Sequence, residues 1–144
     1  MASVFDVAKY ILMKTGKMTT MKLQKLLYYS QAWSLVWDEQ PLFDNVIQAW
    51  ANGPVAPSVY NYHRGLYFVD SDKFPMADPS NLTDTQRETV DAVLAYYGDK
   101  PAQWLIDLTH SEKPWQDARK GLGPGERGNN DISHASMADY YSGL

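Results

Sequence analysis

The stretch Lys22-Leu23-Gln24-Lys25-Leu26-Leu27-Tyr28-Tyr29-Ser30-Gln31-Ala32-Trp33 decides the fold that we expect for this chain. Its apolar side chains fall on nearly every side of a helix, and its only charges are two lysines near its start. A helix that is apolar all round is usually buried on all sides. We therefore expect a helix from about residue 19 or 20 to residue 38, at the centre of a compact, mainly helical domain.

The two lysines of this stretch stand at the unfavourable end of the helix. Lys22 and Lys25 lie in its first turns, where the helix dipole disfavours a positive charge. One interpretation is that both side chains run over an apolar rim and hold their ammonium groups in water. The other interpretation is that an acidic group of a partner lies near them.

Size and composition restrict the class of protein. A chain of 144 residues fits one domain with one core, and we place that domain at residues 3–142. A net charge of −4 argues against a nucleic-acid partner. The absence of cysteine excludes disulfides, thiolate metal sites and cysteine nucleophiles. No stretch approaches the ~20 apolar residues of a membrane span, so we expect a cytoplasmic protein.

The other elements follow from caps and periodicity. Ser3 with Asp6 and Thr83 with Gln86 have the spacing of capping boxes, and Gly16 suits a left-handed residue after the first helix. The apolar run at residues 46–51 predicts a small β element, followed by a turn at Asn52-Gly53-Pro54. Besides the central helix and a short strand at residues 68–69, we expect helices at residues 3–15, 57–62, 83–97, 101–110, 114–120 and 133–142.

No catalytic or metal signature survives inspection. Residues 123–128 match G-x-G-x-x-G, but no strand precedes them and Pro124 removes an amide that a phosphate would need. His110-Ser111-Glu112 matches the H-x-E of zinc deaminases, which also require cysteines. The three histidines lack metal-ligand spacing. We expect no metal, no cofactor and no enzymatic activity, and keep a hydrolase-like enzyme that uses His110 and Glu112 as a minor alternative.

Three segments carry a resemblance to a known family. They are residues 18–33, residues 41–43 with residues 49–60 (Ala-Trp-Ala-Asn-Gly-Pro-Val-Ala-Pro-Ser-Val-Tyr), and residues 108–115 (Leu-Thr-His-Ser-Glu-Lys-Pro-Trp) followed by Ala118-Arg119. In this order and spacing they resemble the Panacea domain, the antitoxin domain of the SocA-like, phage-associated proteins. The resemblance covers about residues 3–141.

The resemblance implies a mostly helical domain with a small β element near its middle segment. It implies a non-enzymatic antitoxin of a toxin–antitoxin system, active in phage defence, that neutralises a protein toxin by direct binding. One branch of the family resembles a proteolytic adaptor that delivers its toxin to an AAA+ protease, and this is the alternative function. Some relatives carry an additional DNA-binding domain, for which this chain has no room.

Within these segments we single out eight residues. Gly53 and Pro54 are expected to set a turn. Trp50 and Tyr60 are expected to fill the core, one on each side of this turn. Trp115 is also expected to pack in the core. The other four are polar residues in apolar segments, which either satisfy buried backbone groups or mark a partner-binding groove: Lys22, Lys25, His110 and Glu112.

Overall fold

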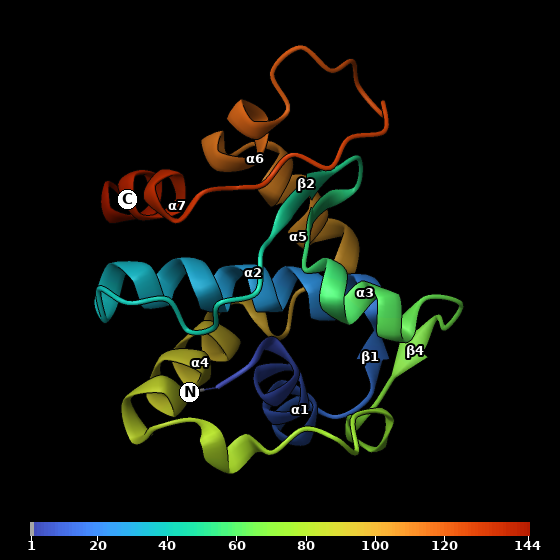
Figure 1. The fold of residues 1–144 in the computed structure, drawn as a ribbon, viewed down its shortest axis with the longest axis vertical. Helices are drawn as coiled ribbons and strands as arrows, with labels where there is room; N and C mark the ends of the chain where they lie inside the picture. The colour runs from blue at the N-terminus through green and yellow to red at the C-terminus, as the bar shows by residue number, and fades with distance from the viewer. Residues whose placement is uncertain (1) are drawn as a thin grey trace.

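Helix α2 (Thr20–Trp37) runs through the middle of the molecule, as expected (Figure 1). The computed structural model describes residues 2–144. Residues 23–26 are all buried, and four consecutive residues of a helix point to all of its sides. The remaining elements are α1 (Val4–Thr15), β1 (Met18–Thr19), β2 (Gln48–Trp50), β3 (Gly53–Val55), α3 (Pro57–His63), β4 (Phe68–Val69), the 3₁₀ turns η1 (Ser71–Lys73) and η2 (Pro79–Asn81), α4 (Asp84–Tyr97), α5 (Ala102–His110), α6 (Lys113–Ala118) and α7 (His134–Ser142).

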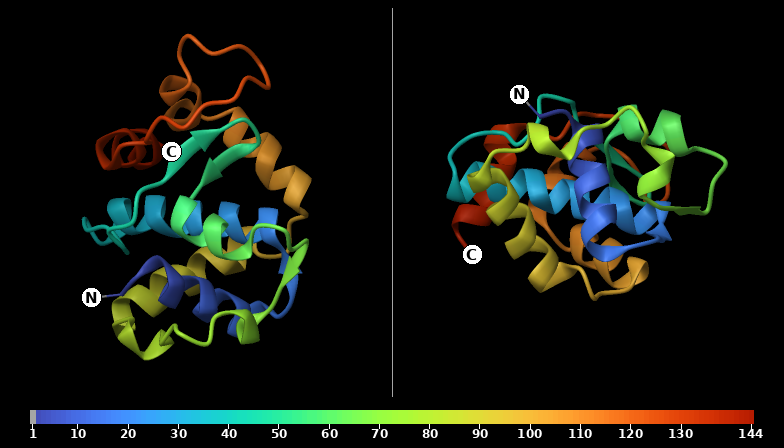
Figure 2. Two further views of the ribbon diagram at one scale, coloured as in Figure 1. Left: turned by 45° about the vertical axis from the view of Figure 1, so that its right-hand side comes forward. Right: turned by 90° about the horizontal axis from the view of Figure 1, so that it is seen from below.

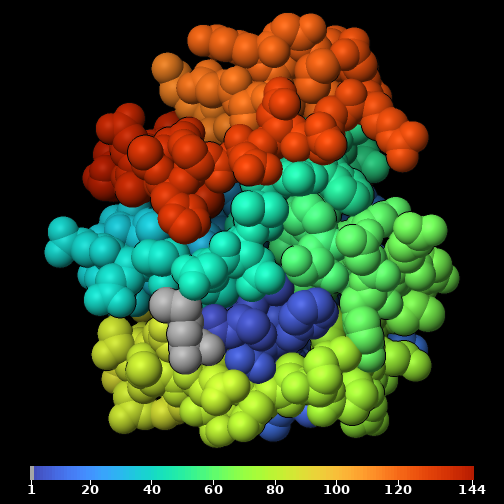
Figure 3. Space-filling model, viewed as in Figure 1, coloured from blue at the N-terminus to red at the C-terminus, as the bar shows by residue number. Residues whose placement is uncertain are grey.

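Two layers enclose α2. Helices α1 and α4 lie on one side, and the β2–β3 hairpin with α5, α6 and α7 lies on the other (Figures 1 and 2). Figure 3 shows that α6 and the glycine-rich loop after it form one end of the molecule. The prediction of a mainly helical fold around a buried central helix is confirmed.

Two glutamines on α2 hold the chain that returns across it. The side-chain oxygen of Gln31 accepts from the backbone N–H of Leu42 at 2.7 Å, and its nitrogen donates to the carbonyl of Phe43 at 2.8 Å. Gln24 binds the backbone of Ala56 in the same way. Its side-chain oxygen accepts from the N–H at 2.8 Å, and its side-chain nitrogen donates to the carbonyl at 3.4 Å. Because buried polar groups require partners, these amides replace the water that the two chain segments lose.

The caps predicted from the sequence are present. Ser3 and Asp6 form a complete capping box on α1, and Thr83 and Gln86 form another on α4. Gly16 has a φ of +87°, as expected, but its ψ of −171° is extended and not helical. The chain therefore leaves α1 directly into β1, a strand that the sequence did not predict.

The β element lies where the apolar run predicted it. Strands β2 and β3 form an antiparallel hairpin that pairs Gln48 with Val55 and Trp50 with Gly53. Gly53 and Pro54 belong to β3, so the turn itself is Ala51-Asn52 and the prediction was shifted by about one residue. On the other edge of the hairpin, Ile132 donates its N–H to the carbonyl of Ile47 at 2.8 Å. Strand β4 pairs with β1 in a second small sheet.

Across residues 2–144, no helix combines the length and the apolar character that crossing a bilayer requires.

Candidate functional site

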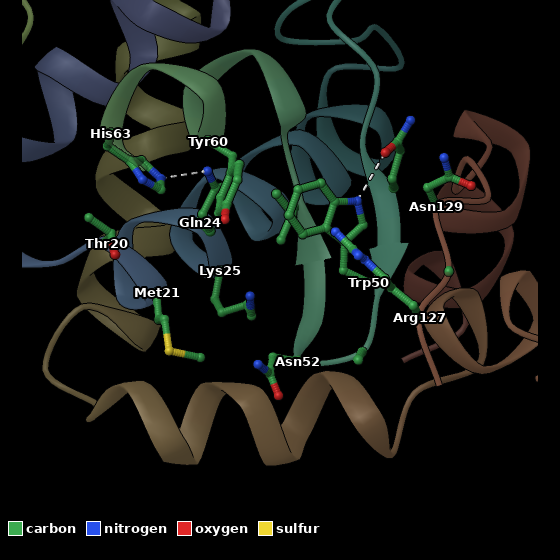
Figure 4. Close-up of a pocket in the computed structure, with 14 residues that line it drawn as sticks. Thr20, Met21, Gln24, Lys25, Trp50, Asn52, Tyr60, His63, Arg127 and Asn129 are labelled. Atoms are coloured by element: carbon green, nitrogen blue, oxygen red, sulfur yellow. Dashed lines mark hydrogen bonds between the residues drawn. The ribbon is translucent and has the colours of Figure 1, made fainter. Parts of the chain in front are cut away.

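A pocket of about 700 Å³ opens beside the first turns of α2 (Figure 4). The β2–β3 hairpin forms one wall, α3 forms another, and the glycine-rich loop contributes residues 127–129. The pocket is lined by Thr20, Met21, Gln24, Lys25, Gln48, Trp50, Ala51, Asn52, Val55, Tyr60, His63, Arg127, Gly128 and Asn129.

Lys25 is buried within this pocket. The side chain is 1% exposed, and its Nζ donates a hydrogen bond to the carbonyl of Pro54 at 3.0 Å. Burial lowers the pKa of Lys25 to about 7, because a low-dielectric surrounding disfavours the charged form. The prediction that this side chain holds its ammonium group in water is therefore wrong. Lys22, one turn earlier, is half-buried.

Gly53 makes room for this lysine. A Cβ at position 53 would lie 2.7 Å from Cε of Lys25 and 3.1 Å from Oγ1 of Thr109. The residue also has a φ of +116°, which side chains rarely allow. The glycine and the lysine therefore belong to one structural unit, although the sequence suggested only a turn for the glycine.

Trp50 and Tyr60 form the aromatic wall of the pocket. Their ring centroids are 4.7 Å apart in an edge-to-face arrangement, and both side chains are half-buried. The indole N–H of Trp50 donates to the side-chain oxygen of Gln48 at 2.9 Å. The expectation that these rings fill core on opposite sides of the turn is corrected, because they contact each other and face the pocket (Figure 4).

His63 lies at the α3 side of the pocket, next to Gln24. Nε2 of His63 is 2.9 Å from the side-chain nitrogen of Gln24, which can only donate, so Nε2 accepts. Burial is the main cause that lowers the pKa of His63, and the charge of Lys25 lowers it further. The imidazole is therefore neutral near pH 7 and carries its proton on Nδ1.

Side chains from the third segment, residues 108–115 with Ala118-Arg119, bind the backbone of the hairpin. The indole N–H of Trp115 donates to the carbonyl of Trp50 at 2.8 Å, and Nη1 of Arg119 donates to the carbonyl of Ala49 at 3.0 Å. His110 stacks on Trp115 with ring centroids 4.0 Å apart. Burial first, and then the charge of Lys25, lower the pKa of His110. Trp115 is half-buried and packs against the core, as its sequence context predicted.

Glu112 lies in a separate, aromatic cluster. Its Oε1 accepts from the hydroxyls of Tyr29 at 2.6 Å and Tyr141 at 2.7 Å. Burial raises the pKa of Glu112, and these two hydrogen bonds oppose the rise. His110 and Glu112 are close in sequence but have different partners, so the structure does not bring them together as an acid–base pair.

Most of the residues that line the pocket were not singled out in the sequence, and three of them stand out for their polar chemistry. Gln24 and His63 bind each other from helices that are far apart in the chain, and Arg127 reaches the pocket from the glycine-rich loop. Only Gln24 had a visible signal, as an uncharged polar residue in an otherwise apolar helix. Within residues 2–144, no group of three or more histidine, aspartate or glutamate residues is placed to hold a metal ion.

The comparison with protein families bears directly on these segments. The model described as antitoxin SocA-like, Panacea domain, matches residues 23–116, a range that contains α2 from its first turn, the hairpin and Trp115. Searches of curated proteins and of solved structures gave no match. With the family model covering most of its length, the chain belongs to the SocA-like antitoxin family and carries the Panacea domain.

Proposed function

We propose that this chain is the antitoxin of a toxin–antitoxin system and neutralises a cognate protein toxin by binding it directly. The observation that carries the proposal is the family match over residues 23–116. We further propose that residues 3–142 act as one domain, that the protein is not an enzyme and that it works in the cytoplasm, in phage defence.

A surface suited to a protein partner lies beside the pocket. Four large apolar side chains are exposed within residues 62–68, which we call the 62–68 surface: Tyr62 at 44%, Leu66 at 43%, Tyr67 at 70% and Phe68 at 47%. Contiguous exposed apolar side chains often mark interaction sites, and tyrosine is enriched among the residues that dominate binding energy. We propose that this surface contacts the toxin.

The eight residues singled out in the sequence take different roles in this proposal. Lys22 is a half-buried residue in the first turn of α2, two positions after Thr20, whose N–H donates to the carbonyl of Tyr67 at 3.0 Å. We assign Lys22 to the rim of the toxin contact. The remaining seven shape the pocket or support the hairpin and the tyrosine cluster: Lys25, Gly53, Pro54, Tyr60, His110, Glu112 and Trp115.

Co-expression with the product of the adjacent reading frame tests the proposal. The neighbouring protein is expected to arrest growth when it is expressed alone, to lose this effect when the chain is present, and to co-purify with it. A neighbour that is harmless alone, or a pair that never associates, would reject the proposal. The half-life of the toxin separates two mechanisms: an unchanged half-life indicates blocking, whereas a shorter one that depends on an AAA+ protease indicates an adaptor.

A further inference from the structure

We propose that the pocket is a binding site for a small molecule that joins an oxyanionic group, carboxylate or phosphate, to a flat ring. The oxyanion would bind beside Nζ of Lys25, and the ring would lie against Trp50 and Tyr60. The inference is independent of the toxin, because it concerns the chain alone.

The charge of the pocket favours an anion. Lys25 and Arg127 line it, and none of the described residues that line it is an aspartate or a glutamate. In the part of the chain that the structure describes, neither cation forms an ion pair with an acidic side chain. Thr20 and Met21, from the first turn of α2, also line the pocket, which lies alongside this helix. A cleft lined by one sign of charge concentrates ligands of the opposite sign.

Lys25 supplies the strongest single argument. A buried ammonium group without a carboxylate is costly. Nζ of Lys25 has three N–H donors, and among the described residues it donates to the carbonyl of Pro54, which leaves donors for a ligand. Burial lowers the pKa of Lys25 to about 7. An oxyanion beside Nζ would favour the charged form and form charge-assisted hydrogen bonds with it.

The aromatic wall indicates the rest of the ligand. The indole N–H of Trp50 is already used by Gln48, so Trp50 offers a ligand its ring and not its donor. Tyr60 stands 4.7 Å from it, measured between ring centroids. A volume of about 700 Å³ lies within the range of pockets that take small organic ligands. A bare inorganic ion would leave this apolar wall uncovered.

The test uses the full chain without any partner, so its outcome does not depend on the toxin proposal. Phenyl phosphate and benzoate are the two oxyanion probes. Inorganic phosphate lacks the ring, benzyl alcohol lacks the anion, and N-acetylglutamate amide presents the carboxylate that an acidic protein side chain would offer. Titration calorimetry gives each affinity, and the NMR signal of the Trp50 indole N–H reports whether the pocket is the place of binding.

We expect phenyl phosphate or benzoate to bind about fivefold or more tightly than each of the three reference compounds. This ratio corresponds to the lower end of the free energies known for stacking on aromatic side chains. Binding by phenyl phosphate alone would identify a phosphate ligand, and binding by benzoate alone a carboxylate ligand; either supports the proposal. Equal binding of N-acetylglutamate amide would overturn it in favour of an acidic protein side chain. An unchanged Trp50 signal with every probe would also overturn it.

Two variants identify the cation that binds. Lys25→Met keeps the length of the side chain and removes its charge, and we expect the affinity for the best probe to fall about tenfold or more. Arg127→Gln changes an exposed side chain, which leaves the fold intact, and should lower the affinity about threefold. Lys113→Gln, an exposed residue outside the pocket, is the control with unchanged affinity. Wild-type affinity in both pocket variants would reject the proposal. If Lys25→Met does not fold, the wild-type protein decides: phenyl phosphate and benzoate that bind no more tightly than benzyl alcohol would reject the proposal.

Discussion

The hydroxyl of Tyr141 donates a hydrogen bond to Oε1 of Glu112 at 2.7 Å, which connects the last helix to the start of α6. Because this hydroxyl has only one proton to give, Tyr28, 3.0 Å away, donates to it in turn. Tyr29 donates to the same Oε1 at 2.6 Å and stacks on Tyr97. The cluster therefore joins α2, α4, α6 and α7 around one buried carboxyl group.

We expect Glu112→Ala to lower the free energy of unfolding by about 2–4 kcal/mol, because it leaves two buried hydroxyls without their acceptor. Tyr141→Phe should cost about 1–2 kcal/mol, since Tyr29 still binds the carboxyl group. Urea unfolding followed by circular dichroism measures both values. Ser142→Ala, an exposed neighbour on α7, is the control and should stay within about 0.5 kcal/mol of the wild type. A stable Glu112→Ala variant would contradict the role assigned to this cluster.

The same carboxyl group predicts a pH dependence. Burial raises the pKa of Glu112 above its ordinary value of 4.5, so the folded state binds this proton more tightly than the unfolded state does. The contribution of Glu112 to stability is therefore largest below pH 4.5 and decreases as the pH rises through the raised folded pKa. The difference in unfolding free energy between the wild type and Glu112→Gln, measured across this range, isolates the effect. A difference that is independent of pH would refute it.

Lys25→Met is expected to stabilise the protein at low pH. The pKa of Lys25 falls from 10.5 to about 7 on folding, so charging the buried amine opposes folding. This penalty is fully present below about pH 7 and disappears as the pH rises through 10.5. We expect a gain of about 1–4 kcal/mol at pH 6 that shrinks at pH 9. Thermal unfolding at the two pH values measures the gain, and an equal gain at both pH values would contradict this account.

Gly53→Ala should destabilise the fold by about 1–3 kcal/mol, because the new methyl group meets Lys25 and Thr109 in a strained backbone conformation. Gly65→Ala is the matched control. Gly65 also has a positive φ, +92°, but a Cβ there meets no atom within 4 Å. Chemical denaturation gives the loss of unfolding free energy in each variant. The difference between the two losses measures the cost of the contacts with Lys25 and Thr109 alone. Equal losses would show that only the backbone conformation matters.

Tyr67→Ala tests the 62–68 surface. If the toxin contacts this side chain, its removal should raise the dissociation constant of the complex about tenfold or more, the usual effect of losing an aromatic residue that dominates an interface. The free energy of unfolding should change by less than about 0.5 kcal/mol, because the side chain is exposed. Tyr96→Ala, at 64% exposure on α4 against 70% for Tyr67, is the control. Titration calorimetry with the purified toxin measures the dissociation constant of each variant. An unchanged affinity for Tyr67→Ala would place the interface elsewhere.

Local signals in the sequence were sufficient for most of the helices. The capping boxes at Ser3 and Thr83 act within one turn of chain, so their sequence spacing is enough to predict them. The all-round apolarity of α2 likewise follows from its own residues. The two-residue strand β1 has no such signal, because its pairing with β4 depends on residues about fifty positions away.

The chemistry of the site depended on distant partners. The burial of Lys25 requires the space that Gly53 leaves in another element, and the role of Glu112 requires Tyr141 from the last helix. Neither relationship has a periodicity that a single sequence displays. The sequence identified these residues as unusual in their segments, but their partners became visible only in three dimensions.

The way that Gln24 and Gln31 hold the returning chain has a consequence for variation. Both amides bind main-chain groups, those of Ala56, Leu42 and Phe43, and every residue except proline offers the same N–H and carbonyl. These attachments are therefore insensitive to which side chains the returning segments carry. An antitoxin built in this way can exchange the exposed residues beside these buried positions, such as Asp44, and so change the surface that it presents to a toxin, while the path of its backbone stays the same.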